Sequence, residues 1–393
     1  MRGGQAESIK DILVKLRYYA SISVDLSLYS LAFSDREAAM EVLRIEREVD
    51  ELYKRLIAKS LVALRGLSQA PLAFGLMAVS SALDTITDAS ADLATVTLRG
   101  YPVHPYITAV ACQGEAVGFI RSGRSVSRLP ARVDILAIKR GDQLIVAPLS
   151  EAIEEGDLVV ARGPLDELSQ LAGALGAPSA ISRCGVEIQV QAMGGDPLAS
   201  TLLSLKNTSR VMVDLAFYSL LNNDVEIAET VAEMEEYVDK LYHEALEFIV
   251  ASSHPGASRE YVSLLILVKG LEEFSDAALR VANVVRYGEN APVLAKAVGG
   301  GEEAYVRVRF TGGGPVELDT LDLEDRGFIP LAVFKPRLRD WITPPTPRIL
   351  VEPGDQLILK YYRESVGVEE RVFGELRALG LELVRLEALE HTS

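Results

Sequence analysis

The sequence predicts a mainly α-helical protein with α+β parts, in which two three-helix bundles alternate with two small α+β domains. The run from Val24 to Leu31 returns as Val213 to Leu220, and the shift that takes Tyr29 to Tyr218 continues into the next helix. A segment of short strand patterns with a Gly-Asp pair follows each helical copy. A repeat this long indicates duplicated domains, because solenoid repeats run to about 20–50 residues. We expect domains at residues 1–100, 101–178, 179–290 and 291–393.

Composition restricts the function classes. The chain has 393 residues and a net charge of −16, which argues against a nucleic-acid partner and against docking on anionic lipid. The N-terminus lacks a signal-peptide pattern, and the weakly polar stretch from Ala70 to Leu83 is shorter than the roughly 18 residues of a membrane span. Cys112 and Cys184 are expected to be small buried thiols in a reducing cytoplasm.

The first bundle follows from helical periodicity. Apolar or small residues at alternating steps of three and four predict a helix over residues 9–33. The sequence Ser34-Asp35-Arg36-Glu37 predicts a capping box with Ser34 as the cap of a second helix, which ends near Gly66. Pro71 suits the first turn of the third helix, which Gly100 and Pro102 stop.

From Tyr101 onward, strand patterns replace the helical period. Strands over 133–138 and 144–147 flank a hairpin turn at Gly141-Asp142. A further strand is expected over 157–161, a short helix over 165–172, a linker from Gly173 to Arg183, and a strand over 186–190.

The second half repeats this plan. Its bundle runs over residues 197–286, with Asn223 or Asp224 as the cap of the second helix and His254-Pro255-Gly256 before the third. Strands are expected over 304–310, 331–334, 348–351 and 356–360, and a final helix over 368–379. Trp341 and Pro344-Pro345 fill the loop where the first half has Lys139-Arg140-Gly141.

Acidic pairs at helical spacing are the candidate functional residues. Residues four apart share one helix face, and each pair begins one position after an apolar stripe residue. The pairs therefore border the seam between the second and third helix of each bundle. They are Glu46 with Asp50 and Asp84 with Asp88 in the first copy, and Glu235 with Asp239 and Glu272 with Asp276 in the second.

If the pairs in one bundle face each other, four carboxylates converge, and they repel unless a cation joins them or protons are retained. Carboxylates from facing helices hold metal ions in helix bundles. Two alternatives stay open: the pairs are ordinary solvated surface, or Arg44, Arg47 and Lys54 neutralise them without metal. Asp25 and Asp214 precede stripe positions and would add a ligand or cap a buried donor.

We do not expect an enzyme. The sequence has no nucleophile motif, P-loop or dinucleotide fingerprint. The four histidines are scattered: His104, His243, His254 and His391.

The helical copies resemble the PhoU family of phosphate-uptake regulators. The similar residues are Val213-Asp214-Leu215-Ala216, Glu235-x-x-x-Asp239-Lys240-Leu241-Tyr242 and Glu272-Glu273-Phe274-Ser275-Asp276, and in the first copy Glu46-x-x-x-Asp50-Glu51-Leu52 and Asp84-Thr85-Ile86-Thr87-Asp88. The resemblance implies two acidic motifs per three-helix bundle, which in some members hold multinuclear iron or zinc clusters. Asp92 stands where the family often has Asn, and Arg280 departs from that pattern in the second copy.

The strand-rich segments resemble the TrkA-C domain, the RCK C-terminal module of potassium-uptake subunits. The similar residues are 133–141 with Glu155-Gly156-Asp157-Leu158-Val159-Val160, and Glu352-Pro353-Gly354-Asp355-Gln356-Leu357-Ile358 in a second copy that is otherwise degenerate in sequence. This resemblance implies a module that binds a cyclic dinucleotide or another small effector. Together the parts look like the archaeal proteins that combine PhoU and TrkA-C domains.

The expected function is a cytoplasmic regulator of a transport system for potassium, another cation or phosphate, peripheral to a membrane transporter or channel subunit. The cofactors left open are a divalent metal (Fe, Zn or Mg) and a cyclic dinucleotide. Two other functions remain in view: a divalent-metal-binding protein, and a structural adaptor without a ligand. We expect the α+β domains to pair, within a pseudo-two-fold chain or across a homodimer.

Overall fold

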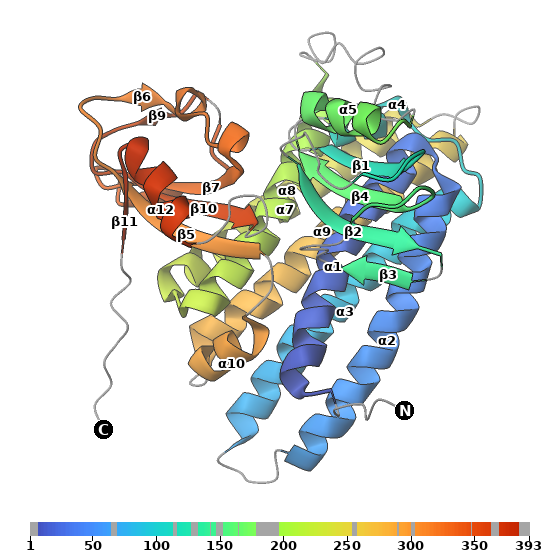
Figure 1. Cartoon of the computed structure of the whole chain (residues 1–393), viewed down its shortest axis with the longest axis horizontal. Coiled ribbons are helices and arrows are strands. Elements are labelled where there is room, and N and C mark those ends of the chain that lie inside the picture. The colour runs from blue at the N-terminus through green and yellow to red at the C-terminus, as the bar shows by residue number, and fades with distance from the viewer. Residues whose placement is uncertain are drawn as a thin grey trace. The chain divides into compact units, whose positions relative to one another are not determined.

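The computed structural model describes residues 7–63, 69–112, 116–126, 133–141, 143–146, 152–163, 165–177, 196–253, 258–288, 291–299, 303–346, 348–362 and 369–384. The chain divides into two compact units, Met1–Gly301 and Glu302–Ser393. The first unit contains both helical bundles and the first sheet, and the second contains the other sheet (Figure 1).

The first bundle consists of α1 (Ile9–Phe33), α2 (Arg36–Ala63) and α3 (Ala70–Leu98), each packed against the other two. Their apolar stripes are buried, with Val49 on α2 and Leu83 on α3 fully covered. The three predicted helices are therefore confirmed. Within the described residues, α3 alone has the length and composition to cross a membrane. Its contacts with α1, α2 and α9 fit a core helix instead.

The turn between α1 and α2 corrects one prediction. Ser34 adopts a left-handed conformation (φ 53°) that ends α1, so it does not cap α2. Asp35 takes that role, because its carboxylate accepts the amides of Glu37 (2.9 Å) and Ala38 (3.0 Å).

The second bundle uses the same turn. It consists of α7 (Pro197–Asn222), α8 (Val225–Ser252) and α9 (Ser258–Tyr287). Asn223 is left-handed (φ 51°), and Asp224 accepts the amide of Ile227, so Asp224 is the cap among the two predicted residues.

The two bundles meet along α3 and α9, which run antiparallel. Leu93 of α3 faces Gly270, and an earlier residue, Thr85, faces the later Arg280. One short helix in each half contacts both bundles. These helices are α4 (Pro105–Ala111) and α10 (Ala291–Val298), and each contacts α1 and α7. The sequence analysis missed both helices and assigned α10 to the last α+β domain.

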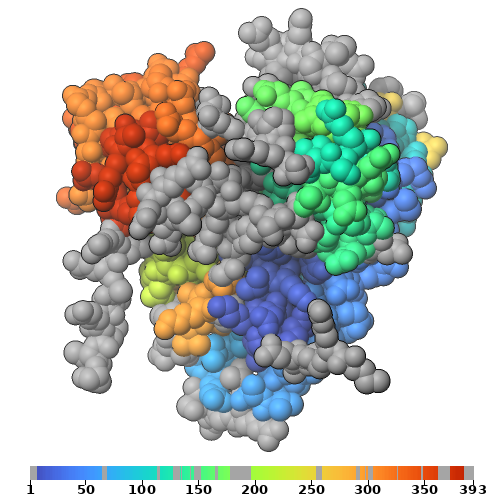
Figure 2. Space-filling model, in the orientation of Figure 1, coloured from blue at the N-terminus to red at the C-terminus, as the bar shows by residue number. Residues whose placement is uncertain are grey.

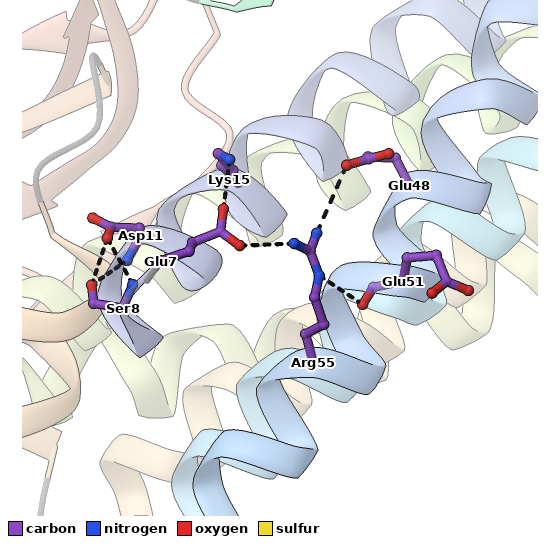
Figure 3. A network of polar contacts seen from close by, with 7 residues as sticks. All are labelled: Glu7, Ser8, Asp11, Lys15, Glu48, Glu51 and Arg55. Carbon is purple, nitrogen blue, oxygen red and sulfur yellow. Dashed lines mark hydrogen bonds and ion pairs between the residues drawn. The ribbon is translucent and has the colours of Figure 1, made fainter. Parts of the chain in front are cut away.

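A polar network joins the start of α1 to α2 (Figure 3). Glu7 accepts from Lys15 at 2.6 Å and from Arg55 at 3.0 Å. Ser8 and Asp11 form the capping box that starts α1. The network fixes the start of α1 beside α2.

The first sheet is antiparallel and has the order β1-β4-β2-β3. Its strands are β1 (Ala116–Arg121), β2 (Asp134–Arg140), β3 (Gln143–Val146) and β4 (Leu158–Gly163), followed by α5 (Leu165–Ala174). The strands and helix predicted over 133–172 are confirmed within a few residues, whereas β1 was missed.

The second unit holds a sheet of order β11-β5-β10-β7-β8 over one hydrophobic core. Its strands are β5 (Glu303–Phe310), β7 (Phe328–Lys335), β8 (Asp340–Ile342), β10 (Gln356–Tyr362) and β11 (Leu381–Leu383); β6 (Val316–Glu317) pairs with β9 (Leu350–Val351), and α12 (Glu369–Ala378) precedes β11. The strand predicted over 348–351 is limited to Leu350–Val351, and β11 was missed.

The two sheets share one design. The order β5-β10-β7-β8 repeats β1-β4-β2-β3, with a register shift at the same place in each central pair. A buried aspartate follows a left-handed glycine in each: Asp157 binds Arg140 at 2.8 Å, and Asp355 binds Lys335 at 2.5 Å. The second copy is degenerate in sequence but not in topology. The likeness to TrkA-C stays a prediction.

Several predictions fall outside the described residues: the strand over 186–190, the connection at His254-Pro255-Gly256, and Cys184. Cys112 is buried but disulfide-bonded, so the expectation that it is a free thiol was wrong.

Candidate acidic seams

We call the four acidic residues at the α2–α3 border seam one and those at the α8–α9 border seam two. Seam one holds Glu46, Asp50, Asp84 and Asp88, and seam two holds Glu235, Asp239, Glu272 and Asp276. Asp88 and Asp239 are exposed, and the other six are half-buried. The carboxylates border the packed stripes because each pair begins one position after a buried residue, such as Ile45 or Leu271.

In seam one the carboxylates raise the pKa values of their neighbours. Burial, followed by the charges of Asp88, Asp50 and Glu46, raises the pKa of Asp84 to about 6. Burial and the charges of Asp50 and Asp88 also raise the pKa of Glu46. Because these effects cross from α2 to α3, the seam concentrates negative charge that favours protons or a cation.

Seam two repeats this electrostatic pattern. Burial, followed by the charges of Asp276, Glu273 and Asp239, raises the pKa of Glu272 to about 7. Burial and Asp239 raise the pKa of Asp276, although Arg280 lowers it. The matching positions in the two bundles therefore meet similar electrostatic environments, apart from the charge of Arg280 in seam two.

One of the three predicted neutralising cations reaches a seam carboxylate. Lys54 Nζ lies 3.7 Å from Asp50 Oδ2. Arg44 pairs instead with the buried Glu41, at 2.7 Å. Arg47 donates to the carbonyl of Leu43, and its charge lowers the pKa of Glu46. Neutralisation without metal is therefore partial.

The seams have ligand types that suit a divalent cation, but their side chains are not positioned to bind one. Carboxylate oxygens are ligands of hard divalent ions, and the mutual repulsion would be relieved by one. Over the described ranges, however, no three His, Cys, Asp or Glu side chains stand close enough together to hold a metal. Side chains would have to turn toward one another before a cation could be held.

Asp25 forms buried ion pairs and does not belong to a seam. It is buried, and its two oxygens bind Arg162 of β4 at 3.2 Å and Arg210 of α7 at 3.1 Å. It therefore joins the first bundle, the first sheet and the second bundle. Its repeat counterpart Asp214 lies half-buried on α7.

Sequence reasoning missed the second contact between sheet and bundle. The buried Glu41 of α2 accepts from Lys139 of β2 at 2.5 Å, and Glu37 accepts from Arg121 of β1 at 2.5 Å. The position of Glu41 among the apolar stripe residues of α2 could have indicated a buried carboxylate with a partner. Lys139 and Arg121 come from strands, and no local sequence pattern predicts that these strands pack against α2.

The comparisons with known proteins agree with the helical repeat. The PhoU domain matches residues 13–97 and 202–285. None of the curated proteins matches the chain in sequence. Among solved structures, PhoU from Pseudomonas aeruginosa shares 14% identity over 71% of this chain and 94% of its own, with a TM-score of 0.40. The phosphate transport system regulatory protein PhoU from Streptococcus pneumoniae shares 13% identity over 70% of this chain and 90% of its own, with a TM-score of 0.38.

The two matched segments coincide with the two bundles that carry the acidic seams. The first covers most of α1 to α3, and the second covers most of α7 to α9. Each half of the duplication therefore contains one segment that matches the PhoU domain.

Proposed function

We propose that this protein is a cytoplasmic, non-catalytic regulator of a phosphate transport system. The observation that carries the proposal is the pair of PhoU domains with acidic seams at matching positions. In this proposal the bundles contact a component of the transporter.

The direct test is co-purification from the organism that encodes the chain, combined with phosphate uptake in a deletion strain. We expect a transporter subunit to be recovered with the tagged protein and uptake to lose its dependence on external phosphate. Recovery of only the protein itself under several lysis conditions, with unchanged uptake, would contradict the proposal. A change in potassium uptake alone would favour the other transport system suggested by the TrkA-C resemblance.

Within this proposal the two sheet modules bind the effector. Both modules have the same strand order and a Gly-Asp turn whose aspartate pairs with a basic residue, which supports a common function. A ligand that binds the native state must raise its melting temperature. Thermal-shift measurements with cyclic dinucleotides, phosphate and potassium would identify the effector. No shift with any of them, or with divalent metals, would favour the structural adaptor.

A second candidate function is divalent-cation binding at the seams. The raised pKa values of Asp84 and Glu272 favour it, because burial and then the charges of neighbouring carboxylates cause them, and a cation would relieve the repulsion among these charges. Elemental analysis after loading with Fe, Zn or Mg tests it. We expect Asp50→Asn combined with Asp88→Asn to remove the metal of seam one only. Fewer than roughly 0.1 ions per wild-type chain would exclude the function, since a site with several oxygen ligands fills to a far higher occupancy.

A further inference from the structure

The end of the α2–α3 hairpin exposes large apolar side chains. Leu61 is 71% exposed and Phe74 is 73% exposed, while Val62 and Met77 are also exposed. We call these four side chains tip one. In Figure 1 the ends of α2 and α3 extend below α1, and in Figure 2 the light-blue atoms of this hairpin lie at the lower end of the surface.

The apolar residues of tip one do not form a single stripe. Leu61 and Val62 are adjacent on α2, so their side chains point about 100° apart, and the small Ala63 that follows is exposed as well. A groove on a protein covers one stripe of a helix, whereas a helix end that is apolar on several sides suits an apolar medium that surrounds it. A lipid bilayer is such a medium.

Along the sequence, the segment around tip one has the opposite sign of charge to the whole chain. Between Glu51 and Asp84 the sequence holds four basic residues and no acidic one, although the chain carries a net charge of −16. Lys54 and Arg55 pair with carboxylates farther from the tip, and Lys59 lies one turn before Val62. Basic side chains beside an apolar end are the composition of segments that lie in membrane interfaces.

The second bundle supplies an internal comparison. At the repeat shift, Leu61 corresponds to Val250, which is 69% exposed. The second hairpin nevertheless carries three carboxylates where the first has other residues: Glu244 in place of Arg55, Glu247 in place of Ala58, and Glu260 in place of Leu72. Tip one differs from its duplicate by the loss of the groups that would oppose insertion.

We infer that tip one inserts into the interfacial region of a lipid bilayer, with the acidic remainder of the first unit facing away from it. The α2–α3 hairpin does not span the membrane, because Val79, Leu83 and the rest of its buried stripe are covered by other helices. Insertion of tip one does not require a particular transporter. The net charge of −16 argues against lipid binding by the chain as a whole but does not describe this tip.

Vesicle partitioning tests the inference. The full chain is mixed with vesicles of phosphatidylcholine, alone or with phosphatidylglycerol, and the bound fraction is measured by sedimentation. We expect binding to both, stronger with phosphatidylglycerol. Leu61→Asp combined with Phe74→Asp should lower the partition coefficient at least about tenfold, because burying one large apolar side chain outweighs a tenfold factor. Val250→Asp with Leu265→Asp, the matched control on the second hairpin, should leave it unchanged.

The single tryptophan of the chain, Trp341, allows a second readout. In a Trp341→Phe background, the Phe74→Trp substitution places a single tryptophan in tip one. Its fluorescence emission should shift to the blue when vesicles are added. Absence of binding to either vesicle, or an equal loss in both double variants, would overturn the inference. So would a dimer that only the tip-one variant abolishes, because the exposed side chains would then serve contact between copies. Unchanged melting temperatures would show that the variants remain folded.

Discussion

At the scale of single residues, the seams are places where folding opposes ionisation. A carboxyl that loses water and gains acidic neighbours prefers its protonated form. Asp84 and Glu272 occupy matching positions, and their pKa values rise to about 6 and about 7 for the same two reasons. The sequence analysis predicted both positions from spacing alone, because helix periodicity fixes which side chains border a seam. It could not predict the rotamers, which decide whether a cation fits.

The raised pKa values predict a pH dependence of stability. At these carboxyls the native state binds more protons than the unfolded chain between about pH 4 and the raised pKa values, so their contribution to stability should fall as pH increases from about 4 to 7. With chelator present, Asp84→Asn should raise the free energy of unfolding at pH 7.5 by on the order of 1 kcal/mol, after allowance for solvent screening, and have less effect at pH 4.5. Urea denaturation measures both. An equal effect at the two pH values would contradict the electrostatic account.

Asp25 offers a contrast between buried and exposed ion pairs. Removing its carboxylate leaves Arg162 and Arg210 without that partner in the interior, so Asp25→Ala should destabilise unit one by about 3–5 kcal/mol. The control is Asp92→Ala, since Asp92 forms an exposed pair with Lys269 and its loss should cost about 0–1 kcal/mol. Similar losses in the two variants would show that the ion pairs of Asp25 do not hold α1, β4 and α7 together.

At the scale of elements, long amphipathic helices were predictable and short connecting elements were not. The stripes of α1, α2 and α3 each extend over many turns, so their periodicity is clear. By contrast, α4 and α10 are short and depend on contacts with the other half of the duplication. β1 and β11 are edge strands whose pairing partners lie far along the chain. Ser34 was misjudged because a left-handed conformation ends α1 there, which no composition rule excludes for serine.

The Gly156-Asp157 turn of the first sheet, whose aspartate pairs with Arg140, leads to a prediction at this scale. Gly156 has a φ of +92° with open space around its α-carbon, so Gly156→Ala is opposed by backbone conformation alone. We expect a loss of about 1–2 kcal/mol in unit one. The matched control is Gly173→Ala in α5, also in open space but helical, which should stabilise by about 0.5–1 kcal/mol. Thermal denaturation of both variants would decide, and a stabilising Gly156→Ala would refute the turn argument.

At the scale of the first unit, the two copies of the duplication make corresponding helix contacts. α3 packs against α9 in antiparallel fashion, and α4 and α10 each contact both α1 and α7. The repeat in the sequence predicted two similar halves. It could not predict which helices would join them, because that choice depends on side-chain volumes that meet only in the folded state. Gly270 beside Leu93 is the clearest such meeting.

A double-mutant cycle at this joint tests the arrangement of the two helical bundles. A β-carbon at Gly270 would come within 3.3 Å of Leu93, so Gly270→Val should crowd the joint and cost about 1–3 kcal/mol. Leu93→Ala should cost about 2–5 kcal/mol by opening a cavity. The double variant should lose less than the sum by more than about 0.5 kcal/mol, because the added methyl groups fill the space that the leucine vacates. Strictly additive losses in urea denaturation would mean that α3 and α9 do not meet at these residues, and the antiparallel joint would have to be abandoned.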